Sequence, residues 1–255
     1  MKRACLSREH SRLILLTLGV LLCVSPAFAE FDQTFSETYP LAMDGSLTLT
    51  NVNGSVSVEG WSRPEVKIEA VKIARGSPSD LYRVKIDVRA TRNSVEVATR
   101  YPDGEGVQVT VNYRVLVPYR AALPHVTTVN GDVVVRGVES SGELRTVNGG
   151  IQLLESAGRF DLRSTNGNVH AELASLRAAD GLNVETVNGA VYVALAPGSS
   201  AELDISSMNG EFRSELPITT TTSRDFRGRL GQGGCPVRIR TINGGIQLVS
   251  SRPTV

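Results

Sequence analysis

Residues 144–153 read LRTVNGGIQL, and nearly the same stretch, IRTINGGIQL, returns at residues 239–248. The Asn-Gly pair at its centre decides the fold, because it recurs through most of the chain. It occurs seven times, at Asn53, Asn130, Asn148, Asn166, Asn188, Asn209 and Asn243. From Asn130 to Asn209 the steps between consecutive asparagines are 18, 18, 22 and 21 residues, and a step of 34 residues follows. A self-similar unit of about 20 residues is typical of stacked, repetitive folds.

The residues around each Asn-Gly pair alternate in polarity. The fourth residue before the asparagine is always aliphatic, as in Leu144 and Leu162, and the second before it is Thr, Ser or Asn. The third residue after it is always apolar, as in Ile151 and Val169. Alternation with a period of two predicts β-strands that bury one face. We therefore expect a strand on either side of every Asn-Gly pair.

Two all-β architectures can use this unit. Asn-Gly between alternating strands is a strong hairpin signal, which would give an antiparallel β meander or sandwich. In a β-helix or β-solenoid each Asn-Gly pair is instead a corner, and equivalent residues stack about 4.8 Å apart on neighbouring coils. Such stacking favours the same residue type at every equivalent position, whereas a hairpin does not require it. The sequence therefore favours a β-solenoid, with inward Thr/Ser and Asn columns that form hydrogen bonds along its axis.

The first 29 residues have the pattern of a secretory signal peptide. Lys2 and Arg3 give a positive start, which is followed by the apolar run Leu13–Val24 and the cleavage signature Ala27-Phe28-Ala29. The run of 12 residues is too short to cross the hydrocarbon core of a membrane. We expect cleavage after Ala29 and export to the periplasm, the cell surface or the medium.

The rest of the chain divides into a part where the repeat is irregular and a part where it is regular. Residues 30–120 are expected to form an irregular N-terminal β region and residues 121–255 the solenoid repeats; alternatively, residues 30–255 form one continuous domain. An insertion at residues 217–236, which contains four glycines, accounts for the 34-residue step. No stretch after the signal peptide reaches 18 apolar residues, so we expect no transmembrane span in the mature chain.

Composition and motifs argue against several classes of function. The 27 basic and 26 acidic residues nearly balance, which disfavours a nucleic-acid partner. His125 and His170 have no Cys, His or Glu at metal-ligand spacing, and the chain has no nucleophile elbow or phosphate-binding loop. Cys235 is the only cysteine after the signal peptide and cannot form an intrachain disulfide. We therefore expect no catalytic residues, no metal site and no cofactor.

The outward positions of the repeat supply a candidate binding stripe. These positions lie three residues before and four residues after each asparagine. The stripe comprises Arg145, Arg163, Glu185 and Arg240 from the first position, and Gln152, His170, Tyr192, Arg213 and Gln247 from the second. Glu185 is its one carboxylate, whereas glycoside hydrolysis requires a pair. The stripe is therefore interpreted as a binding surface, with an ordinary solvated strand face as the alternative.

These motifs resemble those of a known family. The T-V-N-G-x-[IV]-x-[VL] units, the Gly60-Trp61 pair after the first unit and the closing stretch Arg238–Leu248 are similar to bacterial β-strand-repeat envelope proteins that are named as adhesins. That family is a domain of unknown function related to the head-GIN adhesins, and the resemblance covers about residues 38–250. It implies a right-handed β-helix or β-solenoid in the cell envelope, and it assigns no catalytic residues.

The sequence thus predicts an exported, non-enzymatic β-solenoid that acts as an adhesin or scaffold. Its expected partner is an envelope protein or a glycan. One alternative is a carbohydrate-active β-helix enzyme, which would need clustered carboxylates, or a Lys or Arg base beside carboxylates, on one face of several coils. Another is a periplasmic regulatory partner in envelope stress.

Overall fold

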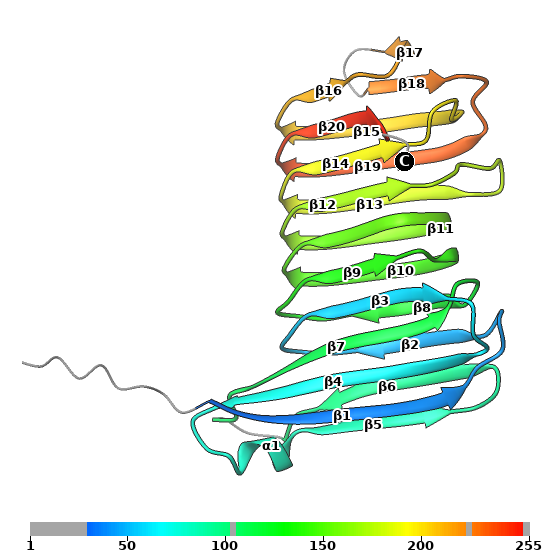
Figure 1. Cartoon of the computed structure of the whole chain (residues 1–255). Coiled ribbons are helices and arrows are strands. Elements are labelled where there is room, and N and C mark those ends of the chain that lie inside the picture. Colours follow the sequence, from blue (N-terminus) through cyan, green and yellow to red (C-terminus); the bar gives the residue numbers. More distant parts are fainter. Residues whose placement is uncertain (1–29, 103–105, 223–225, 252–255) are drawn as a thin grey trace, which may run out of the picture.

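The computed structural model describes residues 30–102, 106–222 and 226–251, so the expected signal peptide lies outside the described residues. Their strands form two stacks that face each other, here called sheet A and sheet B, and the result is an elongated rack (Figure 1). A typical coil contributes one strand to sheet B, turns at an Asn-Gly corner and contributes the next strand to sheet A.

Each sheet runs from one end of the rack to the other. In spatial order, sheet A contains β1 (Glu30–Pro40), β4 (Glu65–Arg75), β7 (Val109–Pro118), β3 (Val56–Trp61), β9 (Val133–Arg136), the first part of β11 (Ile151–Asn166), β12 (Val169–Leu173), β14 (Val191–Leu195), β20 (Ile246–Ser250) and β16 (Phe212–Ser214). Sheet B contains, in the same direction, β5 (Lys85–Ala90), β6 (Ser94–Arg100), β2 (Ser46–Thr50), β8 (Ala122–Thr127), β10 (Glu139–Asn148), the second part of β11, β13 (Gly181–Asn188), β19 (Cys235–Asn243), β15 (Ala201–Asn209), β18 (Phe226–Leu230) and β17 (Ile218–Thr222).

The central coils are parallel and in register, which confirms the predicted β-solenoid. Leu144 of β10 lies beside Leu162 of β11, and Leu162 lies beside Val184 of β13. At both ends of the rack the pairing becomes antiparallel, as between β1 and β4, between β5 and β6, and between β15 and β18. The antiparallel alternative therefore describes only the terminal strands.

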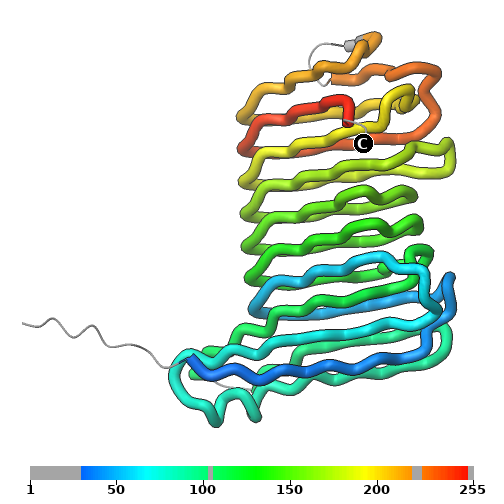
Figure 2. Tube along the Cα trace, in the orientation of Figure 1, coloured from blue at the N-terminus to red at the C-terminus, as the bar shows by residue number. Residues whose placement is uncertain are grey.

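The coils do not stack in the order of the chain (Figure 2). The final coil, β19–β20, lies between the coil β13–β14 and the coil β15–β16. Near the other end, the early coil β2–β3 lies between the strands β6 and β7 on one side and the coil β8–β9 on the other. The first and the last Asn-Gly coils are thus held inside the stack, a feature that the spacing of the repeats did not predict.

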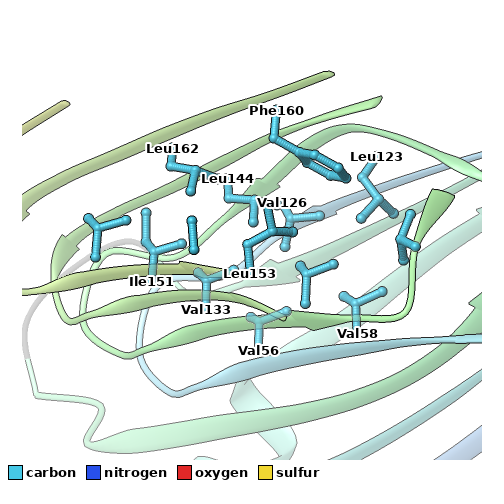
Figure 3. Packing of buried hydrophobic residues seen from close by; sticks show 14 of the residues in the cluster. Val56, Val58, Leu123, Val126, Val133, Leu144, Ile151, Leu153, Phe160 and Leu162 are labelled. Atoms are coloured by element: carbon cyan, nitrogen blue, oxygen red, sulfur yellow. The ribbon is translucent and has the colours of Figure 1, made fainter. Parts of the chain in front are cut away.

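Apolar side chains from the two sheets fill the space between them. Leu144 and Leu162 of sheet B and Ile151 and Leu153 of sheet A point into this space (Figure 3), and all four are fully buried. The aliphatic columns predicted from the repeat therefore form the core. The coil β15–β16 is an exception, because its Phe212 is only half-buried near the end of the rack, where it packs against Phe226 of β18 at 4.5 Å between ring centroids.

The asparagines form a continuous ladder along the corner edge. The side-chain amide of Asn148 donates to Oδ1 of Asn130 at 2.8 Å, and Asn166 donates to Asn148 in the same way at 2.9 Å. The ladder follows the spatial order of the coils, so Asn243 lies between Asn188 and Asn209. From Asn130 onward these side chains are exposed. The expectation of a hydrogen-bonded column is confirmed, but its inward placement is wrong, because the chain turns at the asparagine.

The small polar residues two positions earlier are the ones that point inward. Ser164 Oγ donates to the carbonyl oxygen of Gly149 at 2.9 Å, and Thr146 Oγ1 donates to that of Gly131 at 2.8 Å. Both hydroxyl-bearing residues are buried. These side chains therefore satisfy the glycine carbonyls of the neighbouring coil, whereas the sequence suggested that they would pair with one another.

The glycine of each corner is required by close approach. A Cβ atom at Gly167 would lie 1.9 Å from the carbonyl oxygen of Gly149, and one at Gly149 would lie 2.1 Å from that of Gly131. Neither Gly149 nor Gly167 has a positive φ angle. The missing side chain therefore matters at these corners, whereas at Gly54 the φ angle of 122° also requires the conformational freedom of glycine.

Two irregular segments close the ends of the rack. The insertion at 217–236 contributes β17 and β18, which extend sheet B beyond β15. At the opposite end, the one-turn helix α1 (Asp80–Arg83) connects β4 to β5 and buries Leu81. Lys72 of β4 holds this turn, because its Nζ atom donates to the carbonyl oxygens of Leu81 and Val84 at 3.2 and 2.8 Å. No helix among the described residues is long and apolar enough to cross a membrane.

Candidate interaction surface on sheet B

The structure divides the candidate stripe between two opposite faces. The residues three positions before each asparagine point outward from sheet B, and those four positions after it point outward from sheet A. Sheet B therefore carries Arg145, Arg163, Glu185 and Arg240, whereas sheet A carries Gln152, His170, Tyr192, Gln247 and Arg213. The two groups are separated by the core, so no small ligand could contact both.

Sheet B brings a second column of polar residues next to the first. It lies five residues before each asparagine and contains, in spatial order, His125, Glu143, Asp161, Asn183, Arg238 and Asp204. Sequence reasoning missed this column because its residue types differ from coil to coil. The period of two could have found it, since residues five and three positions before the asparagine face the same side of a strand.

Arg163 is the centre of the charged network on this face. Its Nε and Nη2 atoms contact the two carboxylate oxygens of Asp161, both at 2.9 Å, and its Nε atom lies 3.7 Å from Oε2 of Glu185. The hydrogen bonds and charge of Asp161 raise the pKa of the Arg163 guanidinium. Asn183 also donates from Nδ2 to Asp161, at 3.3 Å. Residues from two adjacent coils therefore hold one another in position.

Further polar contacts extend the network along the rack. His125 Nδ1 lies 3.1 Å from Oε2 of Glu143, and Arg240 Nη2 lies 3.8 Å from Oδ2 of Asp204. The side chain of His125 is 60% exposed on this surface. A depression of about 790 Å³ lies over this part of sheet B, and its lining includes Glu143, Asp161, Asn183, Asp204 and Arg238.

Sheet A carries an aromatic pair at the equivalent coils. His170 and Tyr192 lie on adjacent coils, with 4.7 Å between their ring centroids and planes tilted by 55°. Arg213 Nη2 pairs with Oε2 of Glu211 at 2.7 Å. A hollow of about 680 Å³ lies beside these residues, where Ala190 and Gly245 leave space. Around His170 this face therefore offers an aromatic pair beside one ion pair, while other ion pairs, such as Arg114 with Glu59, lie on other coils of sheet A.

Possible metal ligands and Cys235 are the remaining titratable groups to consider. Within the described ranges, no group of three or more His, Cys, Asp or Glu side chains could hold a metal ion. Cys235 is 1% exposed at the start of β19, and desolvation by burial raises the pKa of its thiol. A buried thiol with a raised pKa is a poor nucleophile. Burial thus keeps the Cys235 thiol away from the outer faces of the two sheets.

Comparison with known families matches this architecture to a named group. The model of the Toastrack DUF4097 family matches residues 32–249, which is most of the chain. The chain belongs to the Toastrack family. The match begins inside β1 and continues into β20, so the Toastrack domain includes both the antiparallel ends and the parallel centre. No curated protein matches this Toastrack chain.

Several solved structures are similar to this Toastrack chain at low sequence identity. A "putative cell adhesion protein" from Clostridium sporogenes is 12% identical, with a TM-score of 0.39 over 86% of this chain and 100% of that one. A "putative adhesin" from Bacteroides fragilis is 11% identical, with a TM-score of 0.44 over 85% and 97%. A "putative lipid binding protein" from Parabacteroides distasonis is 8% identical, with a TM-score of 0.33 over 84% and 96%.

Proposed function

We propose that the protein is an exported, non-enzymatic β-solenoid that binds a component of the bacterial envelope with the outer face of sheet B. The ordered charged network on this face carries the proposal. Asp161, Arg163 and Glu185 come from adjacent coils and already fix one another in position. A partner would therefore meet side chains that lose little conformational entropy on binding. The signal-peptide pattern of residues 1–29 supports export.

The same contacts favour binding over catalysis. Sheet B does carry several carboxylates, which the alternative of a carbohydrate-active enzyme requires. However, both oxygens of Asp161 accept hydrogen bonds from Arg163, and one of them also accepts from Asn183. A general acid or nucleophile needs an oxygen that is free to reach the substrate. The carboxylate at the centre of the network is therefore used to hold the surface together.

Capture of envelope fragments and glycan arrays tests the proposal. We expect the pair of substitutions Arg163→Ala and Glu185→Ala on sheet B to abolish capture. Tyr192→Ala on sheet A and Arg63→Ala beside Trp61 should leave it unchanged. Unchanged capture by the sheet B variant would remove the support for this face. Release of reducing ends or unsaturated products from a polysaccharide, lost in Glu185→Gln, would instead establish the enzyme.

A further inference from the structure

The residue immediately before each asparagine is apolar in six of the seven repeats, although it points away from the core. These residues, here called the apolar ridge, are Val52, Val129, Val147, Thr165, Val187, Ile242 and Met208. Met208 is 75% exposed, Ile242 41% and Val187 36%, whereas the neighbouring Thr186 and Thr241 are buried. Burial in the core therefore does not explain why this position is apolar.

The ridge is continuous because the coils are in register. Val187 lies beside Ile242, and Ile242 lies beside Met208, since the residues that flank them pair across β13, β19 and β15. At about 4.8 Å per coil, the seven positions span about 29 Å along the corner edge. An exposed apolar row on a soluble domain marks a site that contacts another molecule or a membrane.

Arginines border the ridge on sheet B. A groove of about 500 Å³ is lined by the ridge residues Val187, Ile242 and Met208 and by charged residues of sheet B, which are Arg145, Arg163, Glu185 and Arg240. Arg145 lies directly beside Arg163 in the parallel register of β10 and β11. Like charges at such a position repel each other, and an anion placed between them would relieve the repulsion. Among the described residues, Arg145 forms no ion pair within 4.0 Å.

Carboxylates also lie near the ridge, but they are fewer than the arginines or farther from the ridge. Glu185 is the one acidic residue in the arginine column, and it lies near Arg163. The carboxylates of the second column, such as Asp161, lie two residues, or about 7 Å, farther from the ridge. Across the corner, Glu211 pairs with Arg213, and Asp132 accepts a hydrogen bond from the backbone of Gly150. An anionic group that approaches the ridge therefore meets a column of three arginines and one glutamate before it reaches the other carboxylates of sheet B.

We propose that the apolar ridge docks on a membrane surface that contains anionic lipids. The ridge side chains enter the boundary between headgroups and acyl chains, while Arg145, Arg163 and Arg240 contact lipid phosphates. Apolar burial combined with electrostatic attraction is the physical basis of interfacial binding, and it gives reversible, salt-sensitive attachment. The inference rests on the proposed envelope-binding function and names the envelope component.

Co-sedimentation with vesicles tests the docking surface. The exported chain should bind vesicles of phosphatidylcholine with phosphatidylglycerol, and bind at least about tenfold more weakly to phosphatidylcholine alone. The ridge variant Val187→Thr, Ile242→Thr, Met208→Thr should lose about tenfold or more of the binding. Thr165 already occupies a ridge position, so threonine is compatible with the coil. The variant Arg145→Ser should weaken binding and reduce its dependence on salt.

Matched controls come from other surfaces. Tyr82→Ser removes a side chain that is also 75% exposed, and Arg213→Ser removes an exposed arginine from sheet A; both should bind as the unmodified chain does. Equal binding by the ridge variant, binding to glycerol phosphate without binding to vesicles, or self-association through the ridge would each overturn the inference. Envelope capture without vesicle binding would overturn it too, while leaving the proposed function intact.

Discussion

At the scale of single residues, the corner glycines determine whether two coils can approach each other. Replacing Gly167 with Ala would place a Cβ atom 1.9 Å from the carbonyl oxygen of Gly149, so the coils must move apart. We expect Gly167→Ala to lower the free energy of unfolding by about 1–3 kcal/mol, measured by urea denaturation. At Gly245 the nearest atom to a new Cβ lies at 3.5 Å, so Gly245→Ala should change stability by less than about 0.5 kcal/mol. Equal stability of the two variants would contradict this explanation.

The residues that repeat most faithfully were also the ones that could be predicted. Leu144, Leu162 and the ladder asparagine Asn148 sit in columns where stacking on an identical neighbour favours one residue type, so a single sequence reveals them. Asp161 and Glu143 could not be recognised in this way. Their column faces solvent, where many residue types fit a strand, and only the three-dimensional register brings them beside Arg163.

At the scale of elements, a buried hydrogen-bond chain connects three strands of the irregular region. Tyr113 of β7 donates to Oγ1 of Thr99 in β6 at 2.7 Å, because the Thr99 hydroxyl proton is donated to Oδ1 of Asn51 at 2.9 Å. The side-chain amide of Asn51, just after β2, donates to the carbonyl oxygen of Val111 at 2.9 Å. The two sheets are thus joined by polar contacts where the repeat is least regular.

Because the Tyr113 hydroxyl belongs to this buried hydrogen-bond chain, we expect the stability of the protein to change at alkaline pH. Desolvation by burial raises the pKa of Tyr113 to about 12 from its ordinary value of 10.0. Because the unfolded chain loses this proton first, the contribution of Tyr113 is complete below pH 10 and disappears as the pH rises toward 12. We expect urea denaturation to show a loss of about 2–3 kcal/mol over this range that is absent in Tyr113→Phe.

The unmodified protein and Tyr113→Phe should also differ in stability near neutral pH. Tyr113→Phe removes the hydrogen bond to Thr99, so it should be less stable than the unmodified protein by about 1 kcal/mol near pH 7 and more stable by about 1–2 kcal/mol near pH 12. The exposed Tyr82 provides the control, since Tyr82→Phe should leave the pH profile unchanged. Parallel profiles for Tyr113→Phe and the unmodified chain would show that Tyr113 ionises equally in both states.

The order of the coils is the part of the fold that repeat spacing could not supply. Each unit presents the same apolar, hydroxyl and asparagine columns, so any coil can in principle stack on any other. The coil β19–β20 enters the stack between β13–β14 and β15–β16 because β17 and β18 turn the chain back. Sequence periodicity identifies such a unit, but it contains no information on which neighbour the unit selects.

At the scale of the whole molecule, this insertion makes the C-terminal coil indispensable. In a solenoid with sequential coils, removing the last repeat shortens the stack and leaves the rest intact. Here, a chain that ends at Gly234 would leave β13 and β15 without the strand that joins them, and β14 and β16 without β20. The free energy contributed by these strand pairings should exceed the total free energy of unfolding, which is about 5–15 kcal/mol for a typical domain.

Circular dichroism and urea denaturation measure this effect. We expect the chain that ends at Gly234 to lack a cooperative unfolding transition. A chain that lacks only residues 252–255 should keep its midpoint, because β20 ends at Ser250. A truncated chain that unfolds at the same urea concentration as the full protein would show that the coils fold independently of the insertion.

The position of the coil β19–β20 inside the stack also delays folding during synthesis of the chain. A polypeptide emerges from the ribosome, or from an export channel, with its N-terminus first. The strand β19, which bridges β13 and β15, is synthesised after both of them, so the coils cannot stack one after another as the chain lengthens. Until β19 emerges, one or more strand edges stay open to wrong partners. A clipped or stalled molecule would retain such an open edge, and a quality-control protease could recognise it.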